Sequence, residues 1–262
     1  MYENNYRNKI DLLFPAVLSE LVYLDDRDYM EEKLASMGWE LVTVLSFKST
    51  GTYIIVIKKK DFLFVIGRGT EITSIRDIKT DIQIVPIVTD TFEGRVHKGF
   101  YSSFSDAILA VKKILIEQAE KEPYLKIYFT GHSLGAALVS LLYVNLHNYS
   151  VLRPFLKKCI TFGCPKIGDK KFSMNNNFAP DDLIRVVNFN DIVPRRPKLF
   201  RLIFGYRHCG IEYYLDRKHV MHIVPSWKKK CCLTIRGIFS RGFIFACVKN
   251  HSMAEYIKSI TS

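Results

Sequence analysis

One short stretch in the middle of the chain limits its fold more than any other. The apolar run Leu125–Phe129 has the composition of a buried strand, and Ser133–Leu146 is a helix-forming run rich in Leu and Ala. Between them, Gly131 and Gly135 flank Ser133 in a Gly-x-Ser-x-Gly pattern. A strand that turns into a helix within so few residues needs small neighbours at the turn. The stretch therefore predicts a nucleophile elbow, and the alternative is a serine that only caps the helix.

The other predicted elements alternate between strands and helices. The chain begins with a helix, in which Leu12 to Leu24 recur at three- and four-residue steps and Pro15 lies in the first turn. This alternation predicts an α/β fold with a mostly parallel central sheet and helices on both faces, in a single domain over residues 1–262. The predicted strands are Glu40–Phe47, Tyr53–Ile57, Phe62–Ile66 (a meander), Leu125–Phe129, Lys158–Phe162, Leu183–Phe189 and Gly210–Leu215, and the further helices are Phe104–Ala119, Ser133–Leu146 and Met253–Ile260.

A serine at such an elbow needs a base to take its proton and a carboxylate to orient that base. In α/β folds of this kind the order along the chain is Ser, then Asp or Glu, then His. Asp191 follows the predicted strand Leu183–Phe189, at the sheet edge where catalytic groups gather. Asp169, Asp181 and Asp182 precede that strand or lie in polar loops, and we expect them to be solvated. Asp191 is therefore the candidate acid.

Four histidines follow the candidate acid, so chain order alone leaves the base open. His251 lies on a predicted loop just before the final helix Met253–Ile260. A base on a loop can reach the serine more readily than one inside a strand. Position therefore favours His251 mildly, with His208, His219 and His222 as the alternatives.

Several segments around these residues resemble motifs of the lipase class 3 family, the fungal-type triacylglycerol lipases of the α/β-hydrolase fold. The resemblance runs from about Tyr53 to Ile257, which is most of the chain. Gly131–Leu138 reads G-H-S-L-G-A-A-L, the elbow of the family without departure. The other matching segments are Phe64–Thr70 (FVIGRGT), Val96–Phe100 (VHKGF), Phe162–Gly168 (FGCPKIG), Asn190–Arg195 (NDIVPR) and His251–Tyr256 (HSMAEY).

The resemblance implies roles for five residues. Ser133 matches the nucleophile, Asp191 the acid and His251 the base of a catalytic triad. Thr70 matches the residue whose backbone N–H completes the oxyanion hole, and the N–H of Leu134 supplies the other donor. The resemblance implies that the protein hydrolyses lipid esters through an acyl-enzyme, without a cofactor or a metal. Other histidines match motif positions that transfer no proton, namely His97, His132 and His208.

Family lipases cover their site with a lid after the oxyanion strand, which here corresponds to residues 71–85. This segment predicts a short amphipathic helix that closes over an apolar cleft, and the alternative is an ordinary surface helix. Its apolar side is formed by Ile72, Ile75, Ile78 and Ile82. The sequence departs from the family at Gly67, where an aromatic residue usually stands, and this removes a large side chain from the expected pocket wall.

The chain is basic, with 38 Lys and Arg against 26 Asp and Glu and a net charge of +12. Such a charge favours an anionic partner, but the short basic clusters carry no nucleic-acid reader motif, and we expect no nucleic acid. Lys228–Lys230 lies next to Trp227, at the start of an apolar, basic stretch that ends at Val248. This patch predicts peripheral contact with an anionic membrane. The role of the similar stretch Pro197–Tyr206 and the oligomeric state remain open.

The cysteines and the beginning of the chain bear on the compartment. No two of the six cysteines have CxxC spacing, so we expect no zinc or redox motif. Met1–Lys9 is polar and lacks the pattern of a signal peptide, which predicts a cytoplasmic protein with reduced thiols. Cys231 and Cys232 are either lipidated or buried, and burial is favoured.

The motifs leave the substrate open. They do not distinguish a triacylglycerol lipase from a phospholipase A1 or a mono- and diacylglycerol lipase, because head-group selection lies in loops. Another alternative is a catalytically silent lipase-fold protein that binds lipid or protein. Silent relatives usually lose triad residues, whereas this chain keeps Ser133, Asp191 and His251.

Overall fold

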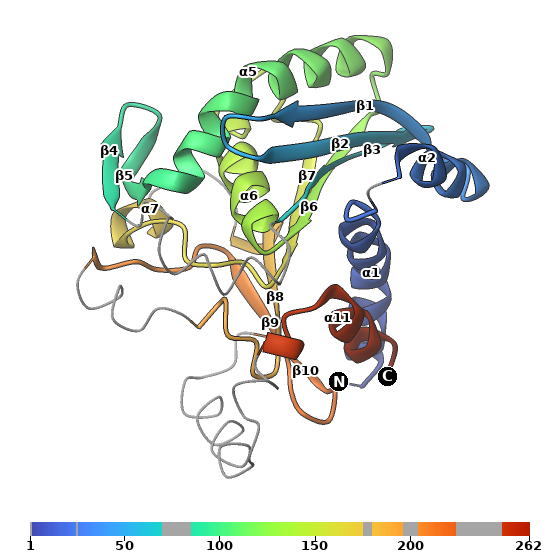
Figure 1. Cartoon of the computed structure of the whole chain (residues 1–262), viewed down its shortest axis with the longest axis vertical. Helices are drawn as coiled ribbons and strands as arrows, with labels where there is room; N and C mark the ends of the chain where they lie inside the picture. The colour runs from blue at the N-terminus through green and yellow to red at the C-terminus, as the bar shows by residue number, and fades with distance from the viewer. Residues whose placement is uncertain (1, 25, 70–84, 175–179, 196–203, 224–247) are drawn as a thin grey trace.

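The computed structural model describes residues 2–24, 26–69, 85–174, 180–195, 204–223 and 248–262, and its centre is an eight-stranded sheet (Figure 1). The sheet has the order β1-β2-β3-β6-β7-β8-β9-β10. Its strands are β1 (Glu40–Phe47), β2 (Thr52–Lys59), β3 (Phe62–Gly67), β6 (Lys126–His132), β7 (Leu156–Phe162), β8 (Leu183–Asn188), β9 (Ile211–Leu215) and β10 (Met221–Ile223).

The middle of the sheet is parallel, as predicted. Strands β3, β6, β7, β8 and β9 pair in parallel, whereas β1, β2 and β3 form the predicted antiparallel meander and β10 turns back against β9. The register places Gly67 beside Gly131, and His132 beside Phe162. Because parallel strands end at the same edge of a sheet, the residues that follow β6, β7 and β8 meet there.

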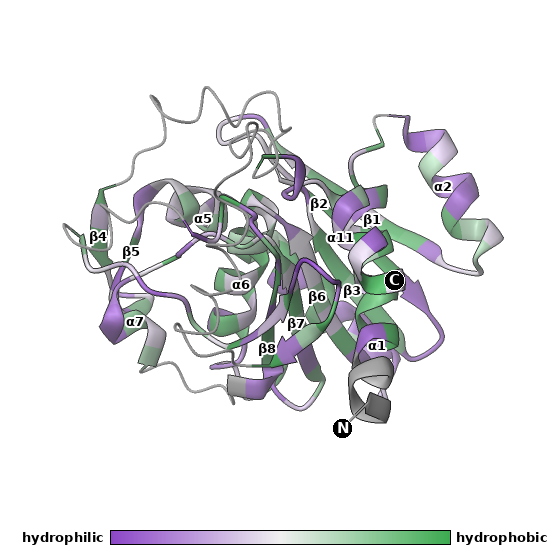
Figure 2. Ribbon diagram, turned by 90° about the horizontal axis from the view of Figure 1, so that it is seen from below, coloured by the Kyte–Doolittle hydropathy of each residue, from purple (hydrophilic) through white to green (hydrophobic). Residues whose placement is uncertain are grey.

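Helices cover both faces of the sheet, which confirms the predicted architecture. On one face lie α5 (Lys98–Lys121) and α6 (Leu134–Leu146), packed against each other and on the sheet. On the other face α1 (Tyr2–Leu21) runs beside α11 (Met253–Thr261) (Figure 1). Figure 2 shows largely hydrophobic strands between these two helical layers. Every residue of α6 from Gly135 to Leu146 is buried, which explains why this helix has no polar face.

The sequence did not predict several smaller elements. These include α2 (Arg27–Ser36), which packs on β1, and the hairpin of β4 (Pro86–Thr89) and β5 (Phe92–His97). Two short helical segments, α7 (Lys170–Met174) and the 3₁₀ turn η1 (Pro180–Asp182), precede β8.

The expected place of Pro15 was wrong, because α1 already begins at Tyr2 and contains this proline. The apolar periodicity starts only at Leu12, so it could not show the polar first half of the helix. A proline inside a helix removes one backbone hydrogen bond. Here Leu12 and Ala16 on either side are buried against the sheet and α11, which offsets that loss.

Packing explains why glycine stands at position 67, where the family usually has an aromatic residue. A Cβ atom built on Gly67 would lie 2.7 Å from the carbonyl oxygen of Gly135 and 2.8 Å from Cγ1 of Val139. The end of β3 thus rests directly on the first turn of α6, and no side chain fits between them. The absence of an aromatic residue brings the predicted oxyanion segment close to the elbow.

Several predictions concern residues outside those that the structure describes. They are the roles of Thr70, of the lid at residues 71–84, of the segments 197–203 and 227–247, and of Cys231 and Cys232. Among the helices that are described, none is both long enough and apolar enough to cross a membrane.

Candidate active site

Ser133 lies at a strained turn between β6 and α6. Its backbone has φ 57° and ψ −123°, a conformation that costs a residue other than glycine about 1–3 kcal/mol. The N–H of Ser133 donates to the carbonyl of Phe162 at 3.0 Å, which ties the turn to β7. The Ser133 side chain makes no capping hydrogen bond to the helix, so the interpretation as a simple N-cap was wrong.

The Ser133 hydroxyl instead contacts a histidine. Its Oγ lies 2.9 Å from Nε2 of His251, and Nδ1 of His251 lies 2.9 Å from both carboxylate oxygens of Asp191. All three side chains are almost completely buried. Because a carboxylate can only accept, Nδ1 carries the proton that faces Asp191, and Nε2 faces the serine hydroxyl. The three predicted triad residues form one continuous chain of hydrogen bonds.

Asp191 has further donors around its carboxylate. The hydroxyl of Tyr256 donates to Oδ2 at 2.6 Å, and the N–H of Val193 donates to Oδ1 at 2.9 Å. Burial, and then the Asp191 charge, raise the pKa of Tyr256 well above its usual value, so the hydroxyl keeps its proton. A buried carboxylate needs such donors. No sequence pattern predicted a role for Tyr256, although this residue ends the matched segment His251–Tyr256.

Gly163 packs directly against His251 and Asp191. Gly163 has φ +61°, and a Cβ on it would lie 2.7 Å from Cε1 of His251 and 2.9 Å from Oδ2 of Asp191. Only glycine meets both the left-handed backbone and this contact. The matched segment Phe162–Gly168 therefore supplies the back wall of the site.

His132 holds the backbone of the base. Its Nε2 lies 2.6 Å from the carbonyl oxygen of His251, and its Nδ1 lies 2.8 Å from the hydroxyl of Tyr23. Burial, and then the proximity of His251, lower the pKa of His132 well below its usual value. The ring is therefore neutral: Nε2–H donates to the carbonyl and Nδ1 accepts from Tyr23. No local sequence signal pointed to Tyr23, which is 109 positions from His132.

The other candidate histidines have different contacts. His208 donates from Nε2 to the carbonyl of Pro194 at 2.8 Å. His222 pairs with Asp216 at 2.8 Å, and His219 lies 2.9 Å from the hydroxyl of Ser259. None of these hydrogen bonds involves Ser133 or Asp191, whereas His251 contacts both.

Of the competing acids, Asp169 is not solvated as expected. Its side chain is only 13% exposed and pairs with Arg95 at 3.1 Å. It also accepts the N–H of Phe172 at 3.0 Å, because it precedes α7 and caps its first turn. Asp181 is exposed on η1, and Asp182 is half-buried there.

Of the two predicted oxyanion donors, Leu134 lies among the residues that the structure describes and Thr70 does not. Leu134 is the first residue of α6, where backbone N–H groups have no acceptor within the helix. Gly69 lies against the elbow, since a Cβ on it would be 3.0 Å from Cβ of Ser133. The helix dipole also favours negative charge at this point. This arrangement is suited to a developing oxyanion, and the role of Thr70 stays a prediction.

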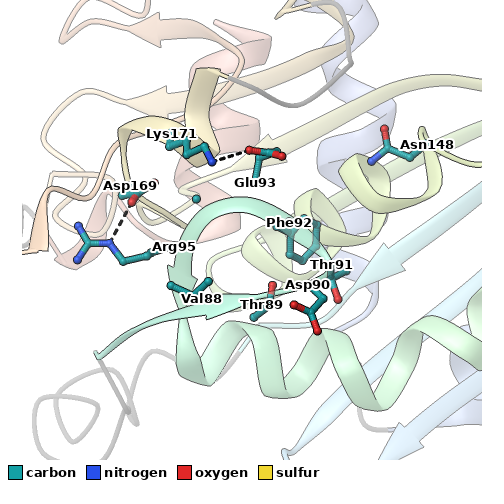
Figure 3. A pocket seen from close by; sticks show the side chains of 11 residues that line it. Val88, Thr89, Asp90, Thr91, Phe92, Glu93, Arg95, Asn148, Asp169 and Lys171 are labelled. Carbon is teal, nitrogen blue, oxygen red and sulfur yellow. Dashed lines mark hydrogen bonds and ion pairs between the residues drawn. The ribbon is translucent and has the colours of Figure 1, made fainter.

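A polar cavity of about 730 Å³ lies away from the triad, between the β4–β5 hairpin and α7 (Figure 3). It contains the ion pairs Arg95–Asp169 and Lys171–Glu93. No triad residue lines it, and five charged side chains do (Asp90, Glu93, Arg95, Asp169 and Lys171), so it does not suit an acyl chain. Within the described ranges, no three His, Cys, Asp or Glu side chains gather in a way that could hold a metal ion.

The fold and the site together define a class of protein. A mostly parallel sheet that carries an elbow serine and a His–Asp pair at its carboxyl edge is an α/β-hydrolase. The sequence profile described as Lipase (class 3) matches residues 64–200, and the chain belongs to this family.

Relatives agree with this membership, and a solved structure agrees with the fold. A lipase from Rhizomucor miehei is 33% identical over 161 residues, which are 58% of this chain and 41% of the relative. Secreted mono- and diacylglycerol lipase 1 of Fusarium solani is 29% identical over 63% of this chain and 47% of its own length. The structure of lipase II from Rhizopus niveus superposes with a TM-score of 0.74 and 23% identity, over 94% of this chain and 93% of its own. The matched region spans less than half the length of these two curated relatives.

We predict that Tyr256→Phe slows the reaction of Ser133 with a fluorophosphonate about tenfold or more. The change removes a donor to the buried Asp191 carboxylate, and hydrogen bonds to charged groups contribute about 1.5–3 kcal/mol. The measurement is the second-order rate constant of labelling. Tyr143→Phe is the matched control, because Tyr143 is also buried but donates to the carbonyl of Lys157 at 3.3 Å. Equal rates in the two variants would contradict the prediction.

We predict that stability falls between pH 6.5 and pH 4, partly because of His97. This ring is buried against Phe100, with centroids 4.0 Å apart, and burial lowers its pKa from 6.5 to about 4. Between these values the unfolded chain binds a proton that the folded chain does not, so unfolding becomes easier by up to about 3 kcal/mol as the pH falls. Urea denaturation should show a shallower acid slope for His97→Phe than for wild type. An acid slope for His97→Phe equal to that of wild type would contradict the prediction.

Proposed function

We propose that the protein is a serine hydrolase that cleaves carboxylic esters of lipids. The observation that carries this proposal is the unbroken chain of hydrogen bonds from Asp191 through His251 to Ser133. Membership of the class 3 lipase family supports lipid esters as the substrate class.

The geometry suits a two-step acyl transfer. Oγ of Ser133 attacks the acyl carbonyl carbon while its proton passes to Nε2 of His251, and the carbonyl electron pair moves onto the oxygen. The oxyanion then collapses and expels the alcohol, which takes the proton from His251. Water repeats the cycle on the acyl-enzyme and releases the fatty acid. Asp191 holds the imidazole tautomer and stabilises its cation.

In this proposal the backbone N–H groups of Leu134 and Thr70 stabilise the oxyanion. Loss of one such donor typically lowers the rate by about 10²–10³-fold. The left-handed backbone of Ser133 supports this role for Leu134, because it places the hydroxyl beside the first amides of α6.

The head group is a second question within the same proposal. We expect a lipase that acts on acylglycerols, and the name of the mono- and diacylglycerol lipase from Fusarium solani supports this expectation. A phospholipase A1 remains the alternative. A catalytically silent lipid- or protein-binding module is less well supported, because binding alone does not need an ordered Asp–His–Ser chain of buried groups.

We predict that Ser133→Ala abolishes both fluorophosphonate labelling and ester hydrolysis, because it removes the nucleophile. His251→Ala should lower kcat by several orders of magnitude, whereas the control His208→Ala should keep most of the activity. The substrates are a chain-length series of p-nitrophenyl esters, an acylglycerol emulsion and phospholipid vesicles. Labelling that survives in Ser133→Ala would remove the assignment, and preferential cleavage of the vesicles would favour the phospholipase.

The protein is further proposed to be cytoplasmic and to contact anionic membranes at their surface. The net charge of +12 and the run Lys228–Lys230 beside Trp227 support this proposal. The three described cysteines Cys159, Cys164 and Cys209 are free and buried, which fits a reducing compartment.

We predict that binding to vesicles requires anionic lipid and weakens at high salt, because each basic residue near such a surface contributes about 1 kcal/mol. Co-sedimentation of wild type with neutral and anionic vesicles tests this. Replacing Lys228–Lys230 by Ser should reduce binding more than the same charge change in three exposed lysines elsewhere, Lys33, Lys121 and Lys158. Salt-independent binding to both kinds of vesicle would argue against an electrostatic contact.

A further inference from the structure

Asn188, the last residue of β8, contacts both segments that carry the acid and the base. Its backbone carbonyl accepts the N–H of Asp191 at 2.7 Å. Its side-chain Nδ2 donates to the carbonyl of Asn250, the residue before His251, at 3.2 Å. The side chain is 2% exposed, so water does not compete for these contacts. One residue therefore links the two turns that must hold the carboxylate and the imidazole together.

The orientation of the Asn188 amide is itself fixed. The hydroxyl of Ser259, on α11, donates to Oδ1 of Asn188 at 3.0 Å. Nδ1 of His219 lies 2.9 Å from the same hydroxyl. Because this hydroxyl donates its only O–H to Asn188, it accepts a hydrogen bond from the N–H of the ring. All donors in this chain point one way, from His219 through Ser259 to Asn188. Because Oδ1 receives the Ser259 proton, the NH₂ group of Asn188 must face Asn250.

We propose that Asn188 is a positioning residue, which sets the distance between Asp191 and His251 and is oriented by Ser259. The inference rests on the proposed function, since it assigns a role within the same triad. A displacement of the base by a fraction of an ångström weakens proton transfer from Ser133 but leaves the acyl-binding surface unchanged. The Asn188 contact should therefore affect kcat and not KM.

The test compares Asn188→Ala and Ser259→Ala with matched controls on α6. Asn145 is also a buried asparagine, and Ser140 is a buried serine that donates to the carbonyl of Ala136 at 2.7 Å. Asn145→Ala and Ser140→Ala remove the same atoms without touching the base segment. The readouts are kcat and KM for a soluble p-nitrophenyl ester, the thermal midpoint, and the downfield proton resonance of His251 Nδ1–H.

We expect kcat to fall about tenfold in Asn188→Ala and about threefold in Ser259→Ala, with KM within twofold of wild type. The Nδ1–H resonance should shift in both variants, and both controls should keep the wild-type kcat and resonance. If Asn188→Ala does not fold, Ser259→Ala carries the comparison.

The inference would be overturned if kcat and the resonance were unchanged in Asn188→Ala, or in Ser259→Ala if Asn188→Ala does not fold. A rise in KM alone would also overturn it. In these cases an active wild type leaves the proposed hydrolase intact. A wild type that neither hydrolyses esters nor reacts with a fluorophosphonate would instead remove the proposed function, and the inference with it.

Discussion

The left-handed backbone of Ser133 is the constraint on which the rest of the site depends. Its conformation costs about 1–3 kcal/mol and persists only if the surroundings determine it. Three features do so: the hydrogen bond to Phe162 on β7, the direct contact between Gly67 and Gly135, and the complete burial of α6 from Gly135 onward. The close approach of β3 to α6 is possible only without side chains. Gly67, which stands where the family usually has an aromatic residue, therefore also helps to hold the strained turn. The strain is thus balanced by packing in the fold's largest hydrophobic cluster.

Burial of the acid and the base imposes a second requirement. An ionised carboxylate without partners inside a protein is very unfavourable. Asp191 meets this requirement with donors from three places: His251, Tyr256 on α11, and the backbone of Val193. Tyr256 lies on α11, which packs beside α1, and His251 lies just before this helix. Docking of the C-terminal helix therefore completes both the electrostatics of the site and the second hydrophobic layer.

Local patterns in the sequence predicted most of the elements, and contacts between distant residues explain what they missed. The strands and the elbow follow from short-range periodicity and from the spacing of Gly131, Ser133 and Gly135, which act within one turn. The choice of His251 among four histidines needed the family resemblance, because chain order alone does not measure distance. Tyr23 and Asn188 were missed for a different reason. The side-chain hydrogen bonds that give them their roles join distant residues: 109 positions separate Tyr23 from His132, and 62 separate Asn188 from Asn250.

These distant contacts explain how three groups from separate parts of the chain hold one geometry. The base segment is fixed at two consecutive carbonyls: Asn188 binds that of Asn250, and His132 binds that of His251. Asn188 ends β8, which leads to the acid, and His132 ends β6, which leads to the nucleophile. The base is therefore attached to the same two strand ends that carry its partners. Because β6 and β8 both pair with β7, the sheet itself sets the relative positions of the triad, and only the imidazole ring needs freedom to move.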